Sequence, residues 1–326
     1  MGVGISAGVV LAAALDIGPG WRGSYVVDAV IGLALVVPSI RRLPESSAAD
    51  PRRVDVPGVL TLGAAMTLLV SGLTQARSGL DPAVLTMFVL AVLLLVAFGV
   101  IEVRSSEPMI EPALLRSPGF LAATIGSLVL GGGIISQSSN VPTVVQLGLG
   151  GSLWAASGLL LVWSVTSVLT SLVVRSVRIP LSGPYLIAVA LVVVGVGQLL
   201  GLGLAVGSSG WRLVPCFLVA GLATGVLNAV LGREAVANVP HDRAAMGSGS
   251  NNTARYLGAA CGITVFSVLA THAGSGVGPA KLVDGWNTAV IVASAITFLG
   301  AAAIALAGRS AKRLPPEEKK SVLTVC

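Results

Sequence analysis

Long apolar stretches follow one another along the chain, separated by short polar ones. A membrane-spanning helix needs about 20 mostly apolar residues, and nine stretches qualify: Trp21–Ile40, Val56–Ala76, Pro82–Ile101, Phe120–Leu147, Trp154–Val174, Pro184–Val206, Leu213–Leu231, Met246–Ala270 and Trp286–Ala307. A tenth, Val3–Leu15, is too short, because residues 1–15 would cover only about 22 Å of a hydrocarbon core about 30 Å thick. The pattern predicts an all-α, polytopic helical bundle in a lipid bilayer.

The composition supports the same fold class. Hydrophobic residues make up 54% of the chain and charged residues 10%, whereas a soluble protein carries about 25% charged residues. This charge is too little to cover a soluble body of 326 residues, which argues against a soluble enzyme, a nucleic-acid-binding domain and a disordered chain. Aromatic residues are only 4% and no stretch alternates as a strand would, so an outer-membrane barrel is not expected.

The distribution of positive charge predicts the orientation. If the polar stretch 41–55 lies in the cytoplasm, strict alternation places 15 Lys and Arg residues on that side and 4 on the other, in agreement with the positive-inside rule. One further cation, Arg255, lies within a segment. We therefore expect a multi-pass protein of the cell membrane with a cytoplasmic C-terminus. The four residues expected outside are Arg22, Arg77, Arg212 and Lys281.

The polar stretches also divide the chain. The expected order is two helices (1–40), a cytoplasmic linker (41–55), a two-helix hairpin (56–101), a cytoplasmic elbow (102–119), a six-helix bundle (120–308) and a cytoplasmic tail (309–326). The six helices form two triplets. Because three is odd, the second triplet enters the membrane from the opposite face, as in the inverted repeats of secondary transporters.

Motifs for cofactor binding and catalysis are missing from the sequence. No GxxxxGK[ST] loop occurs, so we expect no use of ATP, and any transport would draw on an ion or substrate gradient. His241 and His272 are expected on opposite sides of the membrane and the cysteines show no CxxC spacing, so neither a metal nor another cofactor is expected. An integral-membrane transferase would need a site such as Glu102, Glu107 and Glu111, which no His or metal-ligand pattern accompanies.

Polar side chains inside the predicted spans are candidates for function, because lipid solvates them poorly. Asp28 lies about 10 Å into its segment and is either a proton-titrating carboxylate or a residue hydrated near the helix end. Gln137 and Asn140, three residues apart, share a helix face and either face a substrate or join helices. Asn228 and Trp163 are typical of helix packing, although Trp163 would also suit a flat apolar ligand.

The densest polar region lies at the start of the segment Met246–Ala270. Arg255 lies about 12 Å along this helix if the helix begins near Gly247. Its side chain either reaches back to the cytoplasmic interface or binds a carboxylate or an anionic group in a cleft. The candidate for proton coupling is thus Asp28. The candidates for the substrate cavity are Gln137, Asn140, Trp163, Asn228 and Arg255.

Three motifs together resemble a known family. The stretch from Pro240 through Gly247, Asn252-Thr253 and Arg255 to Leu257-Gly258 is similar to the region before the penultimate helix in the fourteen-helix drug/proton antiporters of the major facilitator superfamily. The sequence PMIEPALLRSPGF at 108–120 resembles the elbow before that family's ninth helix. The elements WR, IGL and RLPE between positions 21 and 45 resemble the stretch around its sixth helix.

The resemblance implies that the ten segments are helices five to fourteen, so that 1–40 is a remnant of an N-terminal bundle and the first four helices lie outside this sequence. It implies secondary-active efflux of small amphipathic, drug-like compounds in exchange for protons. It also implies that 184–206 and 286–307 are outer support helices, which lowers the expectation for Gln198. The chain has Asp28 and Val30 at the family's usual Asn and Pro.

Three functions therefore remain to be compared. The leading one is the efflux transporter, and the second is a truncated, non-transporting remnant of one. The third is the membrane transferase. The upstream nucleotide sequence would separate the first two, since four more apolar segments in frame would restore a transporter.

Overall fold

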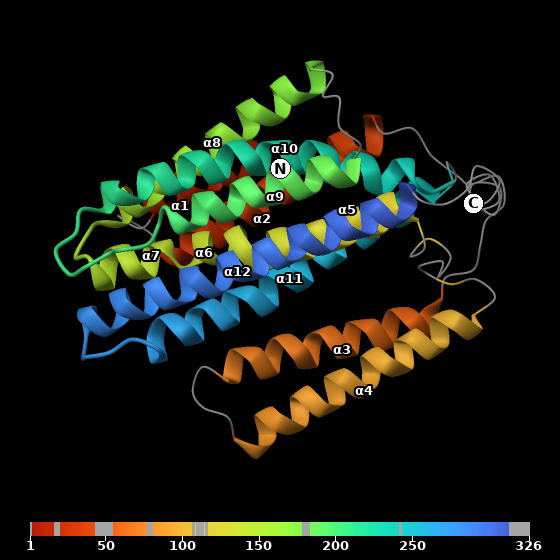
Figure 1. Cartoon of the computed structure of the whole chain (residues 1–326), viewed down its shortest axis with the longest axis horizontal. Coiled ribbons are helices and arrows are strands. Elements are labelled where there is room, and N and C mark those ends of the chain that lie inside the picture. Colours follow the sequence, from red (N-terminus) through yellow and green to blue (C-terminus); the bar gives the residue numbers. More distant parts are fainter. Residues whose placement is uncertain are drawn as a thin grey trace.

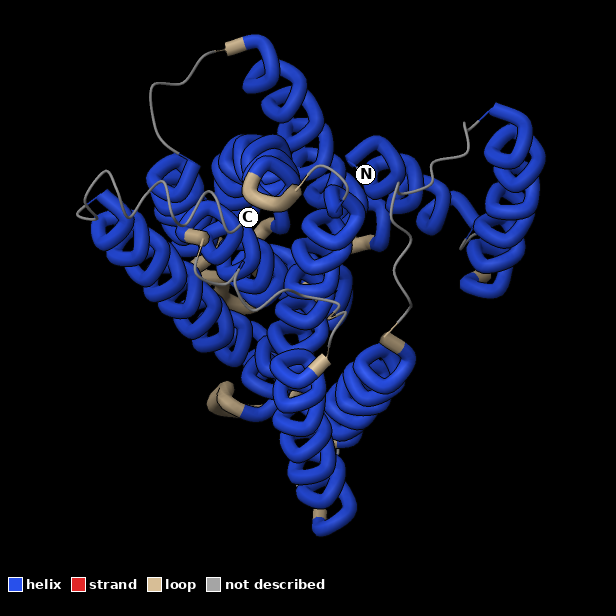
Figure 2. Tube along the Cα trace, turned by 90° about the vertical axis from the view of Figure 1, so that its right-hand side faces the viewer, coloured by secondary structure: helices blue, strands red, loops and turns tan. Residues whose placement is uncertain are grey.

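The computed structural model describes residues 2–15, 20–42, 55–76, 81–105, 108, 114, 117–177, 183–240 and 243–312. These residues form helices and connecting turns, without strands (Figure 2). Eight helical stretches among them are long and apolar enough to cross a membrane. The all-α polytopic fold expected from the sequence is therefore confirmed.

Two pairs of helices precede the bundle. They are α1 (Gly2–Leu15), α2 (Trp21–Arg42), α3 (Val56–Gln75) and α4 (Pro82–Arg104). At 14 residues, α1 is as short as its sequence predicts. The expected linker, elbow and tail fall largely on residues outside the described part of the chain.

The hairpin of α3 and α4 is set by matching N-terminal caps. The Asp55 carboxylate accepts a hydrogen bond from the Gly58 amide at 3.0 Å, and Asp81 accepts one from the Val84 amide at 2.8 Å. A proline follows each cap, where its missing N–H costs no helical hydrogen bond. Gly72 of α3 then lets the ring of Phe88 on α4 pack closely. The two helices pair chiefly with each other and have few contacts with the bundle (Figure 1).

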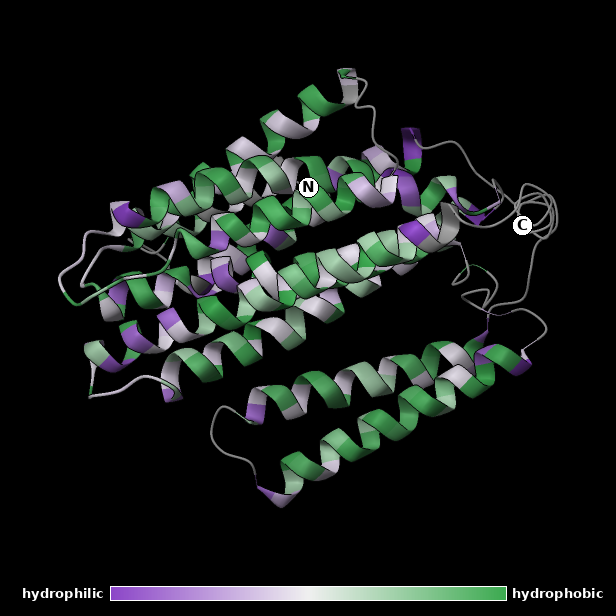
Figure 3. Ribbon diagram, viewed as in Figure 1, coloured by the Kyte–Doolittle hydropathy of each residue, from purple (hydrophilic) through white to green (hydrophobic). Residues whose placement is uncertain are grey.

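The bundle itself contains six helical segments among the described residues, five of which are long enough to cross a membrane, while the sixth, α9, is shorter. The first is broken into α5 (Pro118–Leu130), η2 (Gly131–Ile135), α6 (Ser136–Ser139), α7 (Val141–Thr143) and η3 (Val144–Gly148). The others are α8 (Leu153–Ser176), α9 (Gly183–Leu199), α10 (Val214–Ala237), α11 (Ala244–His272) and α12 (Pro279–Lys312). A 3-10 turn, η4 (Gly210–Leu213), leads into α10. Figure 3 shows that apolar residues cover most of these helices.

The first segment differs from the single helix that its apolar run predicts. Both η2 and η3 are π-helical, and such turns often mark functional positions. Three consecutive glycines occupy η2, and Pro142 lacks the N–H that an uninterrupted helix would use. The glycines therefore account for the π-helical turn η2, and Pro142 accounts for the break between α6 and α7.

The helix α9 is shorter than expected. The apolar run predicts a span over Pro184–Val206, but α9 ends at Leu199 and has 17 residues. Gly203 and Gly207 follow with φ of 75° and 82°, a backbone region that glycine adopts without strain. The Asn287 side chain of α12 accepts from the amide of Gly203 at 3.0 Å and donates to the carbonyl of Leu204 at 3.0 Å. This loop is therefore bonded to α12 rather than continuing as helix.

Glycine brings two pairs of helices into backbone contact. On α10, a Cβ atom at Gly221 would lie 2.7 Å from the Trp163 carbonyl oxygen of α8. On α11, a Cβ atom at Gly258 would lie 2.8 Å from the carbonyl carbon of Leu128 on α5. Real Cβ atoms do not approach so closely, so these crossings require glycine.

The segment that starts with α5 lies at the centre of the bundle, where it contacts α9, α10, α11 and α12. The helices α8 and α10 pack together, as do α9 and α12. The pair α1 and α2 joins the bundle through the contact of α1 with α8, while α3 touches α11. The buried core accordingly lies within the six-helix part of the described chain.

Candidate substrate-binding site

Trp163 and Asn228 lie in the interface between α8 and α10. The Trp163 indole N–H donates to Thr224 Oγ1 at 3.3 Å, and the Asn228 amide donates to Ser167 Oγ at 3.3 Å. Thr224 and Asn228 are one helical turn apart on α10, and Gly225, which lies between them, is in close contact with Ser167 of α8. In this structure the side chains of Trp163 and Asn228 both join two helices, as the packing interpretation of the sequence has it.

Gln137 points into the interior of the bundle. It is fully buried, and its Nε2 donates to Cys216 Sγ on α10 at 3.6 Å. On the adjoining side, Thr297 of α12 donates to Gln198 Oε1 of α9 at 2.8 Å, and Gln198 is also fully buried. Gly201 gives the Gln137 side chain its space. The bundle interior thus holds a polar cluster of two separate contacts, one between α6 and α10 and the other between α9 and α12.

Asn140 lies at the break between α6 and α7. Its side-chain amide donates to the Ser136 carbonyl at 2.9 Å, one turn earlier. This bond satisfies a carbonyl that an interrupted helix leaves free. The side chain of Asn140 is therefore engaged with its own segment, whereas that of Gln137 contacts α10.

Arg255 lies on α11 where this helix crosses α5 and η2. Its side chain is 5% exposed, and its backbone carbonyl lies against Gly131. One turn earlier, Ser127 of α5 donates to the buried Asn251 side chain. A guanidinium is costly to place in a membrane-spanning segment unless the protein supplies it with polar surroundings. Of the predicted residues, Arg255 is therefore the one whose position packing alone explains least.

Asp28 has a different environment. It is exposed on α2, a helix whose apolar span has no residues buried inside the structure. The structure thus places the six candidates in four settings: the α8–α10 interface, the bundle interior, the α5–α11 crossing and the surface of α2.

Sequence reasoning missed three polar contacts. Gln198 was given little weight because its helix was assigned a supporting role, yet it forms the buried bond to Thr297. The Ser127–Asn251 contact has no signal in the sequence, since the residues are 124 positions apart. The signal that could have pointed to Gln198 is that it is a polar residue within the apolar run Pro184–Val206.

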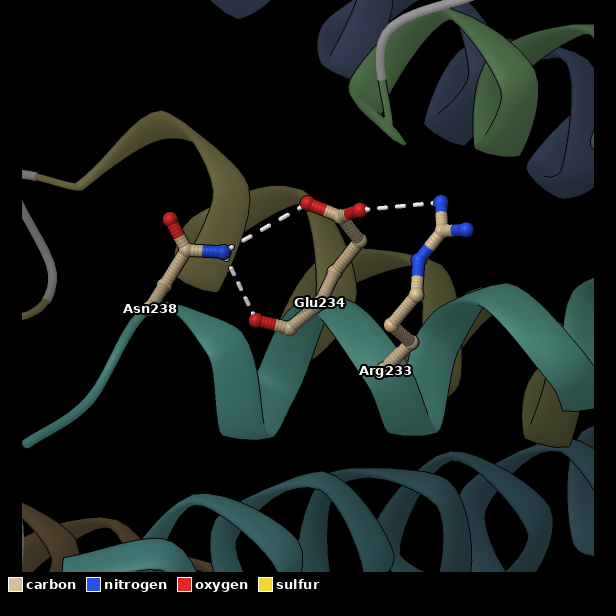
Figure 4. Close-up of polar contacts among 3 residues, drawn as sticks. All are labelled: Arg233, Glu234 and Asn238. Carbon is tan, nitrogen blue, oxygen red and sulfur yellow. Dashed lines mark hydrogen bonds and ion pairs between the residues drawn. The ribbon is translucent and has the colours of Figure 1, made fainter. Parts of the chain in front are cut away.

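The third contact lies at the end of α10. Glu234 accepts from Arg233 at 3.3 Å and from the Asn238 amide at 3.4 Å (Figure 4). Asn238 in turn accepts from Ser117 Oγ at 3.1 Å. The cluster ties the end of α10 to the start of α5. Within the described residues, no group of three or more His, Cys, Asp or Glu side chains could hold a metal ion.

These features define a multi-pass α-helical membrane protein with polar side chains buried between its helices. No profile of a known protein family matches the chain. Individual proteins do. It is 31% identical over 261 residues to the probable actinorhodin transporter of Streptomyces coelicolor, which covers 77% of the chain and 45% of that protein.

Two further relatives are similar over comparable ranges. The tetracenomycin C resistance and export protein of Streptomyces glaucescens is 26% identical over 82% of the chain and 51% of its own length. The multidrug efflux pump LfrA of Mycolicibacterium smegmatis is 27% identical over 77% of the chain and 50% of its own length. The chain is therefore a relative of drug and antibiotic transporters of the major facilitator type, which confirms the resemblance. It spans about half the length of the curated relatives it matches.

Proposed function

We propose that the chain forms part of a secondary-active transporter that exports small amphipathic, drug-like compounds in exchange for protons. The observation that carries this proposal is the similarity to proteins named as transporters, export proteins and efflux pumps over 77% or more of the chain. The buried polar side chains of the bundle support it, because polar groups in membrane spans commonly line transport pathways.

Within this proposal the candidate residues have different roles. Arg255 binds a polar or anionic group of the substrate, and the Ser127–Asn251 contact fixes its helix against α5. Trp163 and Asn228 position α8 against α10. Gln137 and Asn140 shape the interrupted first segment, next to the substrate cavity that this proposal requires. Asp28 is the proposed proton-coupling carboxylate.

The proposed setting is the cell membrane, with the C-terminus and the stretch 41–55 in the cytoplasm. The positive-inside rule supports this orientation through the excess of Lys and Arg on one side. The proposed units remain two N-terminal helices, a hairpin and a six-helix bundle. The helix packing supports this division, since α3 and α4 pair mainly with each other.

A second candidate is a non-transporting remnant of such a transporter. It is favoured by α2, whose apolar span has no residues buried inside the described structure. Alternating access moves one half of a transporter against the other, and the pair α1–α2 contacts the six-helix part mainly through one helix, α8. We therefore expect the chain on its own to bind substrate without transporting it.

The test uses ethidium as a fluorescent cationic probe. In proteoliposomes with an imposed pH gradient, the chain alone should move dye no faster than empty liposomes, although the detergent-solubilised protein binds it. A fusion carrying the first four helices of the actinorhodin transporter should give gradient-dependent movement. Movement by the chain alone would exclude the remnant, while a folded fusion that neither binds nor moves dye would overturn the transporter proposal.

A further inference from the structure

An apolar cavity of about 330 Å³ lies between the hairpin and the bundle. This volume is within the range of about 300–1,000 Å³ typical of small-molecule sites. The walls come from α3, α4, α5, η2, α11 and α12, and they include Leu69, Leu95, Leu128, Gly132, Cys261 and Ile296. The cavity is distinct from the polar cluster around Gln137 and from the α8–α10 interface.

The walls restrict the chemistry of an occupant. Every lining residue is an aliphatic residue, a glycine, Phe266 or Cys261, and none carries a charge, an amide or a hydroxyl group. A ligand with polar groups would lose its hydrogen bonds to water there without replacing them. A hydrocarbon chain loses nothing of that kind.

The mouth of the cavity is continuous with the lipid-facing surface. Leu128, Val265 and Ile296 line the cavity and are still 40%, 41% and 40% exposed. Along α4, Leu95 lies near the middle of the helix Pro82–Arg104, so the cavity is near the centre of the membrane. Water does not reach this depth, whereas the acyl chains of the bilayer do.

The cavity persists because side chains from the bundle cannot fill its floor. Gly258 and Gly262 hold α11 in backbone contact with α5 and η2, and a Cβ atom at Gly262 would lie 2.6 Å from Gly132 Cα. Larger residues are therefore excluded from this crossing. The hairpin, whose helices pack chiefly on each other, forms the opposite wall of the cavity through Leu69 and Leu95.

From this geometry we propose that the cavity binds one acyl chain of a membrane lipid, which fills the space between the hairpin and the six-helix bundle. The lipid is a resident of the protein and not its transported substrate. It completes the contact between α3–α4 and α11–α12 that the protein leaves partly unfilled.

The test compares two substitutions on α12. Ile296→Trp narrows the mouth of the cavity, whereas Leu299→Trp adds the same side chain at a position that is 71% exposed and does not line it. Delipidated protein in detergent is titrated with palmitoyl-oleoyl phosphatidylglycerol, and bound lipid is counted by native mass spectrometry. We expect the wild-type chain and Leu299→Trp to bind one lipid tightly, and Ile296→Trp to bind it at least tenfold more weakly.

A second variant fills the cavity at another position, so that the test does not depend on the folding of Ile296→Trp. Gly132→Leu fills the cavity from within, since a Cβ atom at Gly132 meets only the Gly258 carbonyl, at an ordinary 3.5 Å. Gly99→Leu on α4, where no atom lies within 4 Å, is its control. Tight binding of one lipid by both cavity variants would overturn the proposal. So would a wild-type chain that retains no lipid, or variants that change the oligomeric state instead of the lipid count.

Discussion

At the scale of single residues, the buried polar side chains of the bundle include neutral groups that join helices and the guanidinium of Arg255. Trp163, Asn228 and Gln198 each bond to a side chain on a neighbouring helix. Such bonds between membrane helices contribute about 0.6 kcal/mol on average and up to about 1.7 kcal/mol. Arg255 is different in kind, because a guanidinium is both more costly to bury and better suited to bind an anionic or carbonyl group.

The first prediction concerns Arg255. Arg255→Lys retains the charge and can still reach an interface, but it loses the planar fork of donors. If Arg255 binds an anionic group of the substrate, the affinity of the solubilised chain for fluorescein, a dye that carries a carboxylate, should fall about tenfold, or about 1.4 kcal/mol, with the melting temperature unchanged. Arg104→Lys, at the exposed end of α4, is the matched control. Equal dye affinity in both variants would leave Arg255 with an anchoring role only.

At the scale of helices, the apolar runs were accurate guides. The run Val56–Ala76 became α3 (Val56–Gln75), and Pro82–Ile101 became α4 (Pro82–Arg104). These ends are predictable because Asp caps and prolines fix them locally. The end of α9 was not, because the bonds from Asn287 come from a residue more than 80 positions away.

The candidate site was predictable only in part. Residue type shows that Gln137 and Arg255 are unusual in lipid, but the face each side chain takes depends on which helices meet. Gln137 was placed with Asn140 by helical spacing, yet it contacts Cys216 while Asn140 bonds to its own segment. The π-helical turn η2 precedes both residues and changes the direction of their side chains relative to α5, and such turns leave no simple periodic signal.

The second prediction tests the glycine contact of α5 with α11. Gly258→Ala places a Cβ atom against the backbone of Leu128, so we expect a loss of about 1–3 kcal/mol in stability. Gly249→Ala on the same helix meets no atom within 4 Å and should be neutral or stabilising by about 0.5–1 kcal/mol. Thermal unfolding in detergent measures both. If the two variants melt together, the close crossing does not govern stability.

At the scale of the whole molecule, the chain combines a well-packed six-helix part with two peripheral helix pairs. The share of buried residues in the most apolar window falls from 67% in the span Pro118–Gly148 to 17% in α3 and 0% in α2. Lipid covers what the protein leaves exposed, so the peripheral pairs depend on the bilayer more than the bundle does. The charges at their ends predict their orientation across the membrane.

The third prediction concerns this orientation. A reporter enzyme that is active only outside the cytoplasm should give no signal when fused after residue 308, and a strong one when fused in the loop at Arg77. The reason is the 15-to-4 division of Lys and Arg. A fluorescent protein that matures only in the cytoplasm provides the reciprocal measurement at each position. The opposite pattern at both sites would reverse the orientation.

The position of α8 has a mechanical consequence. Among the described residues, α8 packs along α10 and along α1, while its contact with α9 is at most marginal. The pair α1–α2 has its main contact with the six-helix part through α8. Within the described part of the chain, a displacement of α1 reaches the six-helix part mainly through α8, and from α8 mainly through α10. Helix α8 therefore transmits a movement of the first helix pair to the six-helix part of the described chain.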